Sequence, residues 1–312
     1  MFPGQGAQNV GMGKELAKND PEIAAIYSNA SDILGYDIAT LCFEGPEEKL
    51  NNTEISQPAI FVTSVACLKA LQEGKLAPGL ADVTADAFAG LSLGEYTALH
   101  AAGTLDFKST LKLVQIRGQS MQQAAELSQG TMVSILGIDE SQAKELAEAV
   151  LAENIDEGNG RSPVLAPVNF NCPGQIVFSG SIKACKRAEE RAEEFGSSRA
   201  IPLKVAGAFH TEMMVPAAEK LGHALKNITY LPFERPVVAN VDANWYSGTE
   251  EIPDKLLRQL VQPVRWQQSI EFFLEQGAER FIEIGPGRVL TGLAKKIFRP
   301  RKVKKTIETV SA

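Results

Sequence analysis

Residues 85–102 read ADAFAGLSLGEYTALHAA, and this stretch decides the class of fold. It opens with a short apolar run that ends in glycine, as buried strands often do, and it closes with a helix-prone segment. Between them stands the pattern G-x-S-x-G, with Ser92 at its centre. In a strand–turn–helix context this pattern is typical of a nucleophile elbow, in which the turn lifts the serine hydroxyl out of the sheet end and the next N–H, that of Leu93, faces an oxyanion. We therefore predict that Ser92 is a nucleophile; a glycine-rich turn without a catalytic role is the alternative.

Helical and strand patterns alternate on both sides of this turn. Apolar residues recur at helical spacing before it and again in a long segment after it. Such alternation indicates an α/β fold with a mostly parallel sheet. We expect a strand at 85–90 and helices at 58–71, 95–102 and 107–127.

The middle of the chain has a different order of elements. It reads as strand, helix, two strands in a hairpin, helix and strand, which is the order of a ferredoxin-like unit. We therefore predict an inserted ferredoxin-like (α+β) subdomain at 128–204 and a discontinuous catalytic core at 1–127 and 205–312. The expected strands of the insertion are 131–136, 164–169, 175–179 and 200–205, and its expected helices are 141–153 and 183–195.

Composition narrows the class of protein. The chain has 312 residues, of which 44% are hydrophobic and 22% charged, values typical of globular domains and unlike those of disordered or collagen-like chains. Its net charge of -7 argues against nucleic-acid binding. No apolar run reaches the roughly 18 residues of a membrane span. We expect a cytoplasmic protein. The abrupt opening at Met1-Phe2-Pro3 leaves room for a removed leader, in which case a plastid or another organelle would be the location.

The four cysteines carry no metal or disulfide pattern. They are scattered, without a C-x-x-C pair or histidine-paired spacing. We expect reduced thiols and no metal site.

A serine nucleophile needs a base, and the chain has three histidines. His100 lies eight residues after Ser92 along the next helix, a rise of about 12 Å, which is too far for contact. His223 falls in an amphipathic helical segment, where a surface or packing role is favoured. His210 follows a strand and precedes a helix, where catalytic residues of α/β sheets collect. We predict that His210 is the base. No acidic residue is placed to orient its ring, and a backbone carbonyl can do so instead.

Arg117 stands in a largely apolar helical segment, where a guanidinium needs an anion. Two interpretations stay open from the residues alone. Arg117 binds a substrate carboxylate or phosphate, or it forms an internal salt bridge.

The motifs in order resemble those of one family, the malonyl-CoA:acyl carrier protein transacylases, which are acyltransferases of fatty acid and polyketide synthesis. The resemblance runs almost from end to end of the chain. The motifs that carry it are FPGQGAQ at 2–8, GMG at 11–13, QPA at 57–59, GLSLGE at 90–95, RG at 117–118, MQ at 121–122, NFN at 169–171, PGQ at 173–175, GAFH at 207–210, QL at 259–260, PV at 263–264 and EIGPG at 283–287.

The resemblance implies a hydrolase-like core and a ping-pong reaction. By it, Ser92 takes the malonyl group from malonyl-CoA with His210 as base, and the phosphopantetheine thiol of acyl carrier protein then accepts the group. The resemblance places the oxyanion hole at the N–H groups of Gln5 and Leu93. It assigns the carbonyl that orients His210 to Gln259.

The remaining site residues are likewise implied by resemblance. Arg117 would pair with the malonyl carboxylate, with Met121 beside it, and Phe209 would exclude a methyl branch on the acyl group. Asn171 would line the pantetheine path, with a turn-forming role as the equal alternative. Leu91 stands where many bacterial members have histidine, which removes any polar contact from that side chain and leaves the dyad intact.

The expected partners are malonyl-CoA and acyl carrier protein, with no nucleic acid, no membrane, no permanently bound cofactor and a monomeric state. The first alternative function is an acyltransferase of a polyketide-type pathway with broader acyl specificity. A serine thioesterase would share Ser92 and His210 but would not need Arg117. A non-catalytic scaffold that binds carrier protein is the third alternative.

Overall fold

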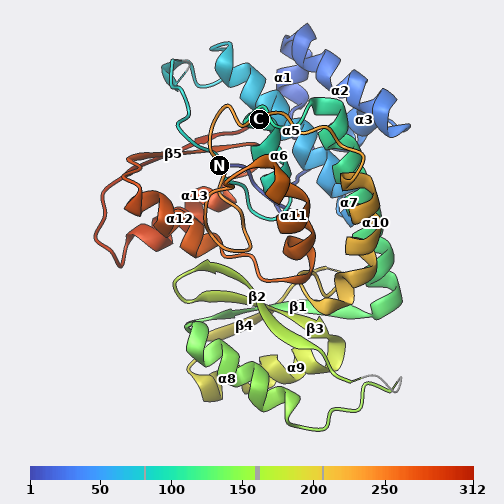
Figure 1. The fold of residues 1–312 in the computed structure, drawn as a ribbon, viewed down its shortest axis with the longest axis vertical. Coiled ribbons are helices and arrows are strands. Elements are labelled where there is room, and N and C mark those ends of the chain that lie inside the picture. The colour runs from blue at the N-terminus through green and yellow to red at the C-terminus, as the bar shows by residue number, and fades with distance from the viewer. Residues whose placement is uncertain (81, 159–161, 206) are drawn as a thin grey trace.

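The computed structural model describes residues 1–80, 82–158, 162–205 and 207–312. The chain forms an α/β structure in two parts (Figure 1). The larger part contains both termini, and the smaller part is a four-stranded sheet with two helices at the bottom of the view.

Helices dominate the larger part. They are α1 (Lys14–Asn19), α2 (Pro21–Leu34), α3 (Ile38–Glu44), α4 (Glu47–Leu50), α5 (Thr53–Gln72), α6 (Gly94–Ala101), α7 (Phe107–Ser128), α10 (Val215–Leu225), α11 (Ile252–Val261), α12 (Trp266–Glu275) and α13 (Val289–Phe298). Short 3-10 turns are η1 (Pro78–Leu80), η3 (Glu212–Met214) and η4 (Thr249–Glu251). The helices predicted at 58–71, 95–102 and 107–127 are confirmed as α5, α6 and α7, and α5 begins five residues earlier than expected.

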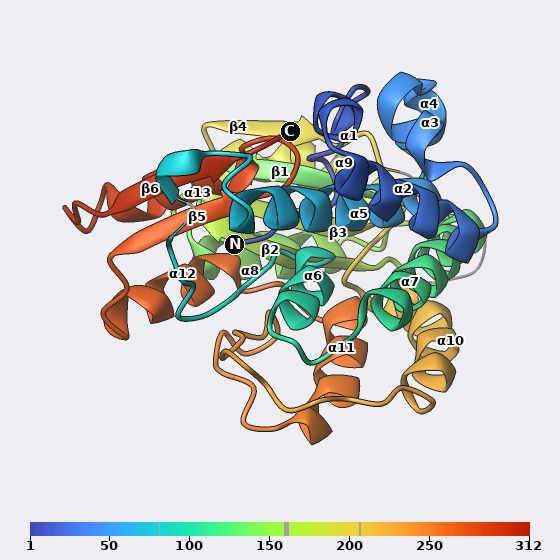
Figure 2. The ribbon, with the colours of Figure 1, turned by 90° about the horizontal axis from the view of Figure 1, so that it is seen from above.

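The larger part contains a parallel pair of strands. Strands β5 (Arg280–Ile284) and β6 (Thr306–Val310) run parallel. The first residues of the chain lie beside β5, because the N–H of Ile284 donates to the carbonyl of Met1 at 2.9 Å. In Figure 2, β5 and β6 lie on one side of the N-terminus with α12 and α13, and α7 and α10 lie on the other side.

The strand expected at 85–90 is present only as two bridged residues. Gly90 is bridged in parallel to Phe2, and Phe88 is bridged in parallel to Val237. The prediction of a continuous strand is therefore wrong. Each neighbour pairs with this segment at a single residue before the chain bends into the turn at Gly90, so the ladder is too short to count as a strand. The parallel direction agrees with the expected sheet.

The smaller part is an antiparallel sheet in the order β2-β3-β1-β4. The predicted sequence of strands and helices is confirmed, with shifts of a few residues at the ends. The elements are β1 (Gly130–Leu136), α8 (Glu140–Leu151), β2 (Leu165–Cys172), β3 (Gln175–Ser181), α9 (Ile182–Arg191), η2 (Ala192–Phe195) and β4 (Arg199–Pro202).

The two faces of this sheet have different partners. Val133, Phe170 and Phe178 pack with α8 and α9 in one apolar cluster, and both helices lie below the sheet in Figure 1. Met132 and Val177 belong instead to the main core. The smaller part thus packs against the larger part through its sheet.

A backbone contact joins the smaller part to the segment after α11. Asn169 of β2 is bridged in parallel to Val264, and the N–H of Val264 donates to the carbonyl of Val168 at 2.7 Å. The end of α11 and β2 are therefore adjacent. Within the described residues, no helix combines the length and the apolar character needed to cross a membrane.

Candidate active site

The turn that carries Ser92 is sharp and depends on its two glycines. Ser92 has a left-handed backbone with φ 52°, which costs energy for a residue with a Cβ. A Cβ on Gly90 would lie 1.9 Å from the backbone of Gly94. A Cβ on Gly94 would lie 2.1 Å from the carbonyl oxygen of Phe2. The G-x-S-x-G pattern is thus required sterically, and α6 begins at once after the turn.

Asn240 holds the turn from the opposite side. The N–H of Ser92 donates to Asn240 Oδ1 at 2.6 Å, and Asn240 Nδ2 donates to the carbonyl of Gly90 at 2.8 Å. Asn240 is fully buried. Sequence reasoning missed this residue, although a polar residue that closes the apolar run at 237–239 is a usable signal.

Of the three histidines, His210 is the one that contacts Ser92. Its Nε2 lies 3.0 Å from Ser92 Oγ, and its Nδ1 lies 2.6 Å from the carbonyl oxygen of Gln259. Its backbone is also left-handed, with φ 62°. Since a carbonyl can only accept, Nδ1 carries the hydrogen and Nε2 is free to accept the serine proton.

The other two histidines lie elsewhere, as expected. His100 Nδ1 pairs with the carbonyl of Leu105 at 2.9 Å, and its ring packs edge-on against Phe61 and Phe107. His223 is exposed on α10. Neither is a base for Ser92.

Burial keeps His210 neutral. The pKa of His210 is lowered to about 4, chiefly because burial disfavours the imidazolium and also because Arg117 is positively charged. The hydrogen bond to the Gln259 carbonyl opposes this shift. Near pH 7 the imidazole is therefore ready to accept a proton.

The side chain of Arg117 extends from α7 to Ser92. Its Nη2 donates to Ser92 Oγ and to Gln259 Oε1, both at 2.9 Å. Its Nη1 donates to Gln57 Oε1 at 2.7 Å, and its guanidinium lies 5.4 Å from the centre of the Tyr96 ring. The side chain is only 1% exposed.

No carboxylate among the described residues forms an ion pair with Arg117. Its Nε is buried without a hydrogen-bond partner. Burial lowers the pKa of this guanidinium from its ordinary value. The internal salt bridge that the sequence left open is thus not found in the described part of the chain. The arrangement provides a buried cation that contacts Ser92 and has an unpartnered donor, Nε, which suits an anionic ligand.

Gln259 joins these groups through both ends of its side chain. Its Nε2 donates to the carbonyl of Ser92 at 2.9 Å and to Glu95 Oε2 at 2.6 Å. Glu95 also accepts from the hydroxyl of Tyr246 at 2.5 Å. No role was predicted for Glu95, Tyr246 or Gln57. A single carboxylate in the apolar helix at 94–101 was the available signal for Glu95.

The other expected site residues lie as follows. Met121 is buried one turn after Arg117, with its Sδ 3.4 Å from Gln57 Nε2. Phe209 is buried next to His210. Leu93 directly follows Ser92, and its N–H enters none of the backbone hydrogen bonds outside helices and strands in the described part of the chain.

Gln5 and Asn171 lie at the edges of this cluster. Gln5 follows the segment that packs on the turn, and its side chain donates to Thr53 Oγ1 at 3.2 Å. Asn171 lies on β2, and its Oδ1 is buried without a partner. None of the hydrogen bonds of the described side chains joins Asn171 to Ser92, His210 or Arg117.

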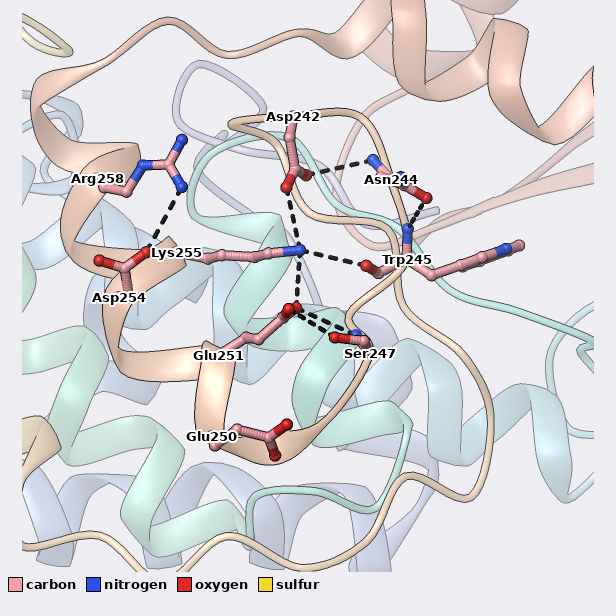
Figure 3. Close-up of a pocket in the computed structure, with 9 residues that line it drawn as sticks. All are labelled: Asp242, Asn244, Trp245, Ser247, Glu250, Glu251, Asp254, Lys255 and Arg258. Atoms are coloured by element: carbon pink, nitrogen blue, oxygen red, sulfur yellow. Dashed lines mark hydrogen bonds and ion pairs between the residues drawn. The ribbon is translucent and has the colours of Figure 1, made fainter.

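A cavity of about 800 Å³ is lined by residues of the segment 242–258 and is a separate feature (Figure 3). Its centre is Lys255, whose Nζ pairs with Asp242 at 3.1 Å and Glu251 at 2.9 Å. None of its lining residues touches Ser92 Oγ. In the described ranges, no cluster of three or more histidine, cysteine, aspartate or glutamate side chains is suited to a metal.

Known proteins resemble this chain in sequence and in structure. The model of the acyl transferase domain matches residues 1–310. The malonyl CoA-acyl carrier protein transacylases of Bacillus subtilis (strain 168) and Escherichia coli (strain K12) are each 42% identical to this chain, over 97% and 95% of it and over 90% and 91% of their own lengths.

Solved structures are similar over the whole chain. One is a malonyl-transacylase in complex with its holo type II PKS acyl-carrier protein, with a TM-score of 0.87, 40% identity and coverage of 99% of this chain and 93% of that one. Another is the acyl-carrier-protein-S-malonyltransferase of Bartonella henselae, with a TM-score of 0.90, 35% identity and coverage of 100% and 94%. The chain therefore belongs to the acyl transferase family, among the malonyl CoA-acyl carrier protein transacylases.

Proposed function

We propose that this protein transfers the malonyl group of malonyl-CoA to the phosphopantetheine thiol of an acyl carrier protein, and so supplies extender units for fatty acid synthesis. One observation carries the proposal: a buried guanidinium without a carboxylate partner in the described part of the chain donates to the nucleophile Ser92. A donor whose acyl group ends in a carboxylate satisfies that cation.

The first half-reaction loads Ser92. Ser92 Oγ attacks the thioester carbonyl while His210 Nε2 takes the hydroxyl proton. The N–H groups of Gln5 and Leu93 hold the resulting oxyanion. When the tetrahedral intermediate collapses, the carbon–sulfur bond breaks and the coenzyme A sulfur takes the proton from His210. The product is a malonyl ester on Ser92.

The second half-reaction returns the enzyme to its starting state. The phosphopantetheine thiol gives its proton to His210 and attacks the ester carbonyl. Collapse breaks the bond to Ser92 Oγ, which takes the proton back. The carbonyl of Gln259 holds the ring in the required tautomer through both halves, because Nδ1–H donates to it at 2.6 Å.

The pocket selects the acyl group through three side chains. Arg117 pairs with the free carboxylate, and Met121 packs beside it. Phe209, next to the base, leaves no room for a methyl branch. Holding the carboxylate also keeps the ester in one orientation until a thiol arrives. Asn171 lines the pantetheine path, a role that its buried and unpartnered Oδ1 supports.

The proposed domain division follows the sheets. Residues 1–127 and 205–312 form a hydrolase-like core, which is supported by the parallel pairing around the nucleophile turn. Residues 128–204 form a ferredoxin-like insertion, which is supported by the strand order β2-β3-β1-β4. The active site then lies between the two, near the contact of β2 with Val264. No permanently bound cofactor is needed for either half-reaction.

The carrier protein remains a choice between two classes. The relative that was solved with a type II PKS acyl-carrier protein supports a polyketide carrier as the second candidate recipient. Discharge rates with one carrier of each class would rank them.

Intact-protein mass after mixing with malonyl-CoA tests the proposal. We expect wild type to gain one malonyl group, Ser92→Ala to gain none, and holo carrier protein to remove the group from wild type. Steady release of malonate without an adduct would identify a thioesterase. No adduct with intact malonyl-CoA would support a non-catalytic scaffold.

A further inference from the structure

Glu95 is a buried carboxylate that the reaction as described does not use. It is the second residue of α6 and is 1% exposed. Three donors converge on it: the Tyr246 hydroxyl at 2.5 Å, Gln259 Nε2 at 2.6 Å and the backbone N–H of Asn240 at 3.1 Å. Its side chain makes no hydrogen bond to Ser92, His210 or Arg117 themselves in the described structure. It contacts the residues that hold them.

The carboxylate has a chemical consequence for Gln259. Glu95 Oε2 also accepts from the backbone N–H of Asn240, and it is an acceptor both when the carboxyl group is ionised and when its proton lies on Oε1, so the amide end that faces it must be the NH₂. The carbonyl of Ser92, 2.9 Å from the same Nε2, demands the same orientation. With the NH₂ end fixed, Gln259 Oε1 must face Arg117, as it does at 2.9 Å.

A reversed amide would be unfavourable on both sides. Oε1 would then face the Glu95 carboxylate and the Ser92 carbonyl, and the NH₂ would face the guanidinium of Arg117. Each of these contacts pairs two acceptors or two donors. Glu95 therefore determines, through the orientation of the Gln259 amide, that an oxygen faces the guanidinium of Arg117.

We propose that Glu95 is a positioning residue for malonyl transfer: it orients the Gln259 amide so that the amide oxygen holds Arg117 toward the acyl carboxylate. This inference rests on the proposed function. Gln57 holds the other side of the guanidinium at 2.7 Å, and Gln57 itself is held by the thioether of Met121. Of the two amides that hold the guanidinium, Gln259 is thus the better fixed, because Glu95 is a more polar partner than the thioether of Met121.

Burying a carboxylate at this position is energetically unfavourable, which supports a functional role for Glu95. The pKa of Glu95 is raised to about 7, because burial disfavours its charge more than the hydrogen bonds from Tyr246, Gln259 and Asn240 favour it. A structural position in an apolar helix would be filled more stably by an apolar side chain.

The test compares two reactions of Ser92 in the same protein. Acylation by malonyl-CoA needs both the nucleophile and Arg117. Sulfonylation by phenylmethanesulfonyl fluoride needs the nucleophile and His210 but has no carboxylate to bind. The ratio of the two rate constants therefore reports on Arg117 independently of how much protein is folded.

We expect Glu95→Met to lower malonyl acylation by about 10- to 100-fold while sulfonylation changes by less than about 3-fold. Glu95→Gln should recover most of the lost ratio, because its carbonyl can accept from Gln259 and its NH₂ can donate to the Tyr246 oxygen. Glu283→Met is the matched control. Glu283 is also fully buried and accepts two backbone N–H groups at the start of α13, so its loss should lower stability and leave the ratio unchanged.

Two results would overturn the inference. One is that Glu95→Met has the same ratio of malonyl acylation to sulfonylation as wild type. The other is that this ratio is as low in Glu95→Gln as in Glu95→Met. If Glu95→Met does not fold, Gln259→Met serves instead, because it removes the amide and keeps the backbone carbonyl at His210. An unchanged ratio there would equally contradict the proposal. Failure of the proposed function itself looks different, since wild type would then react with the sulfonyl fluoride and take up no malonyl group.

Discussion

Arg117 Nη2 donates to Ser92 Oγ at 2.9 Å, so the group that we propose to bind the acyl carboxylate also contacts the proposed nucleophile. This contact fixes the direction of the serine hydrogen. A guanidinium can only donate, and the Gln259 carbonyl can only accept from His210 Nδ1. The hydroxyl of Ser92 must therefore point to His210 Nε2, 3.0 Å away. In the resting protein, the serine hydrogen therefore already points to the nitrogen that would accept it in the proposed reaction.

The low pKa of His210 predicts that the base works far below neutral pH. Because neutral imidazole is the active form, the rate of Ser92 sulfonylation should rise with pH through about 4 and stay level above it. Arg117→Ala removes a positive charge that disfavours the imidazolium, so its profile should shift toward the ordinary histidine value of about 6.5. Rates from pH 4 to 8, with circular dichroism as a check on folding, test this. A wild-type profile centred near 6.5 would contradict it.

Gly90 in the turn at Ser92 and Gly292 in α13 predict opposite signs for the same substitution, glycine to alanine. Gly90→Ala places a Cβ 1.9 Å from the backbone of Gly94, so the turn cannot form as it stands. We expect a loss of stability above about 4 kcal/mol and no malonyl adduct. Gly292→Ala is the matched control, because its Cβ would meet nothing within 4 Å. In the exposed interior of α13 it should stabilise by up to about 1 kcal/mol. Urea denaturation measures both, and similar values for the two would refute the steric account.

Asn240 is predicted to be essential to the shape of the turn. Asn240→Leu keeps the volume but leaves the Ser92 N–H and the Gly90 carbonyl without partners in a buried place. We expect a loss of about 2 to 4 kcal/mol in the free energy of unfolding and slower sulfonylation of Ser92. Asn19→Leu removes an exposed amide that caps only its own helix, and should cost less than about 0.5 kcal/mol. Equal effects in denaturant titrations would show that Asn240 does not brace the turn.

The local parts of this site could be predicted from the sequence, because each is coded by neighbouring residues. The turn at Ser92 follows from two glycines beside an apolar run, and α7 follows from its periodicity. His210 was found by elimination among three histidines. The order of strands and helices from β1 to β4 was predicted because their patterns alternate in a recognisable way.

The parts that could not be predicted depend on residues far apart in the chain. Asn240 meets Ser92 across 148 positions, and Gln259 meets Glu95 across 164. No spacing rule connects such pairs. The strand at 85–90 was predicted as continuous because pattern alone does not reveal how few residues its neighbours pair with.

Donor preference in Arg117→Ala tests the central claim most directly. The measurement is the rate of Ser92 acylation by malonyl-CoA relative to acetyl-CoA, with the exposed Arg235→Ala as control. We predict that Arg117→Ala lowers malonyl acylation by about 100-fold or more, changes acetyl acylation little and so abolishes the preference for malonyl, while Arg235→Ala behaves as wild type. A preserved malonyl preference in Arg117→Ala would contradict the account, because the buried guanidinium would then not be the site of the acyl carboxylate.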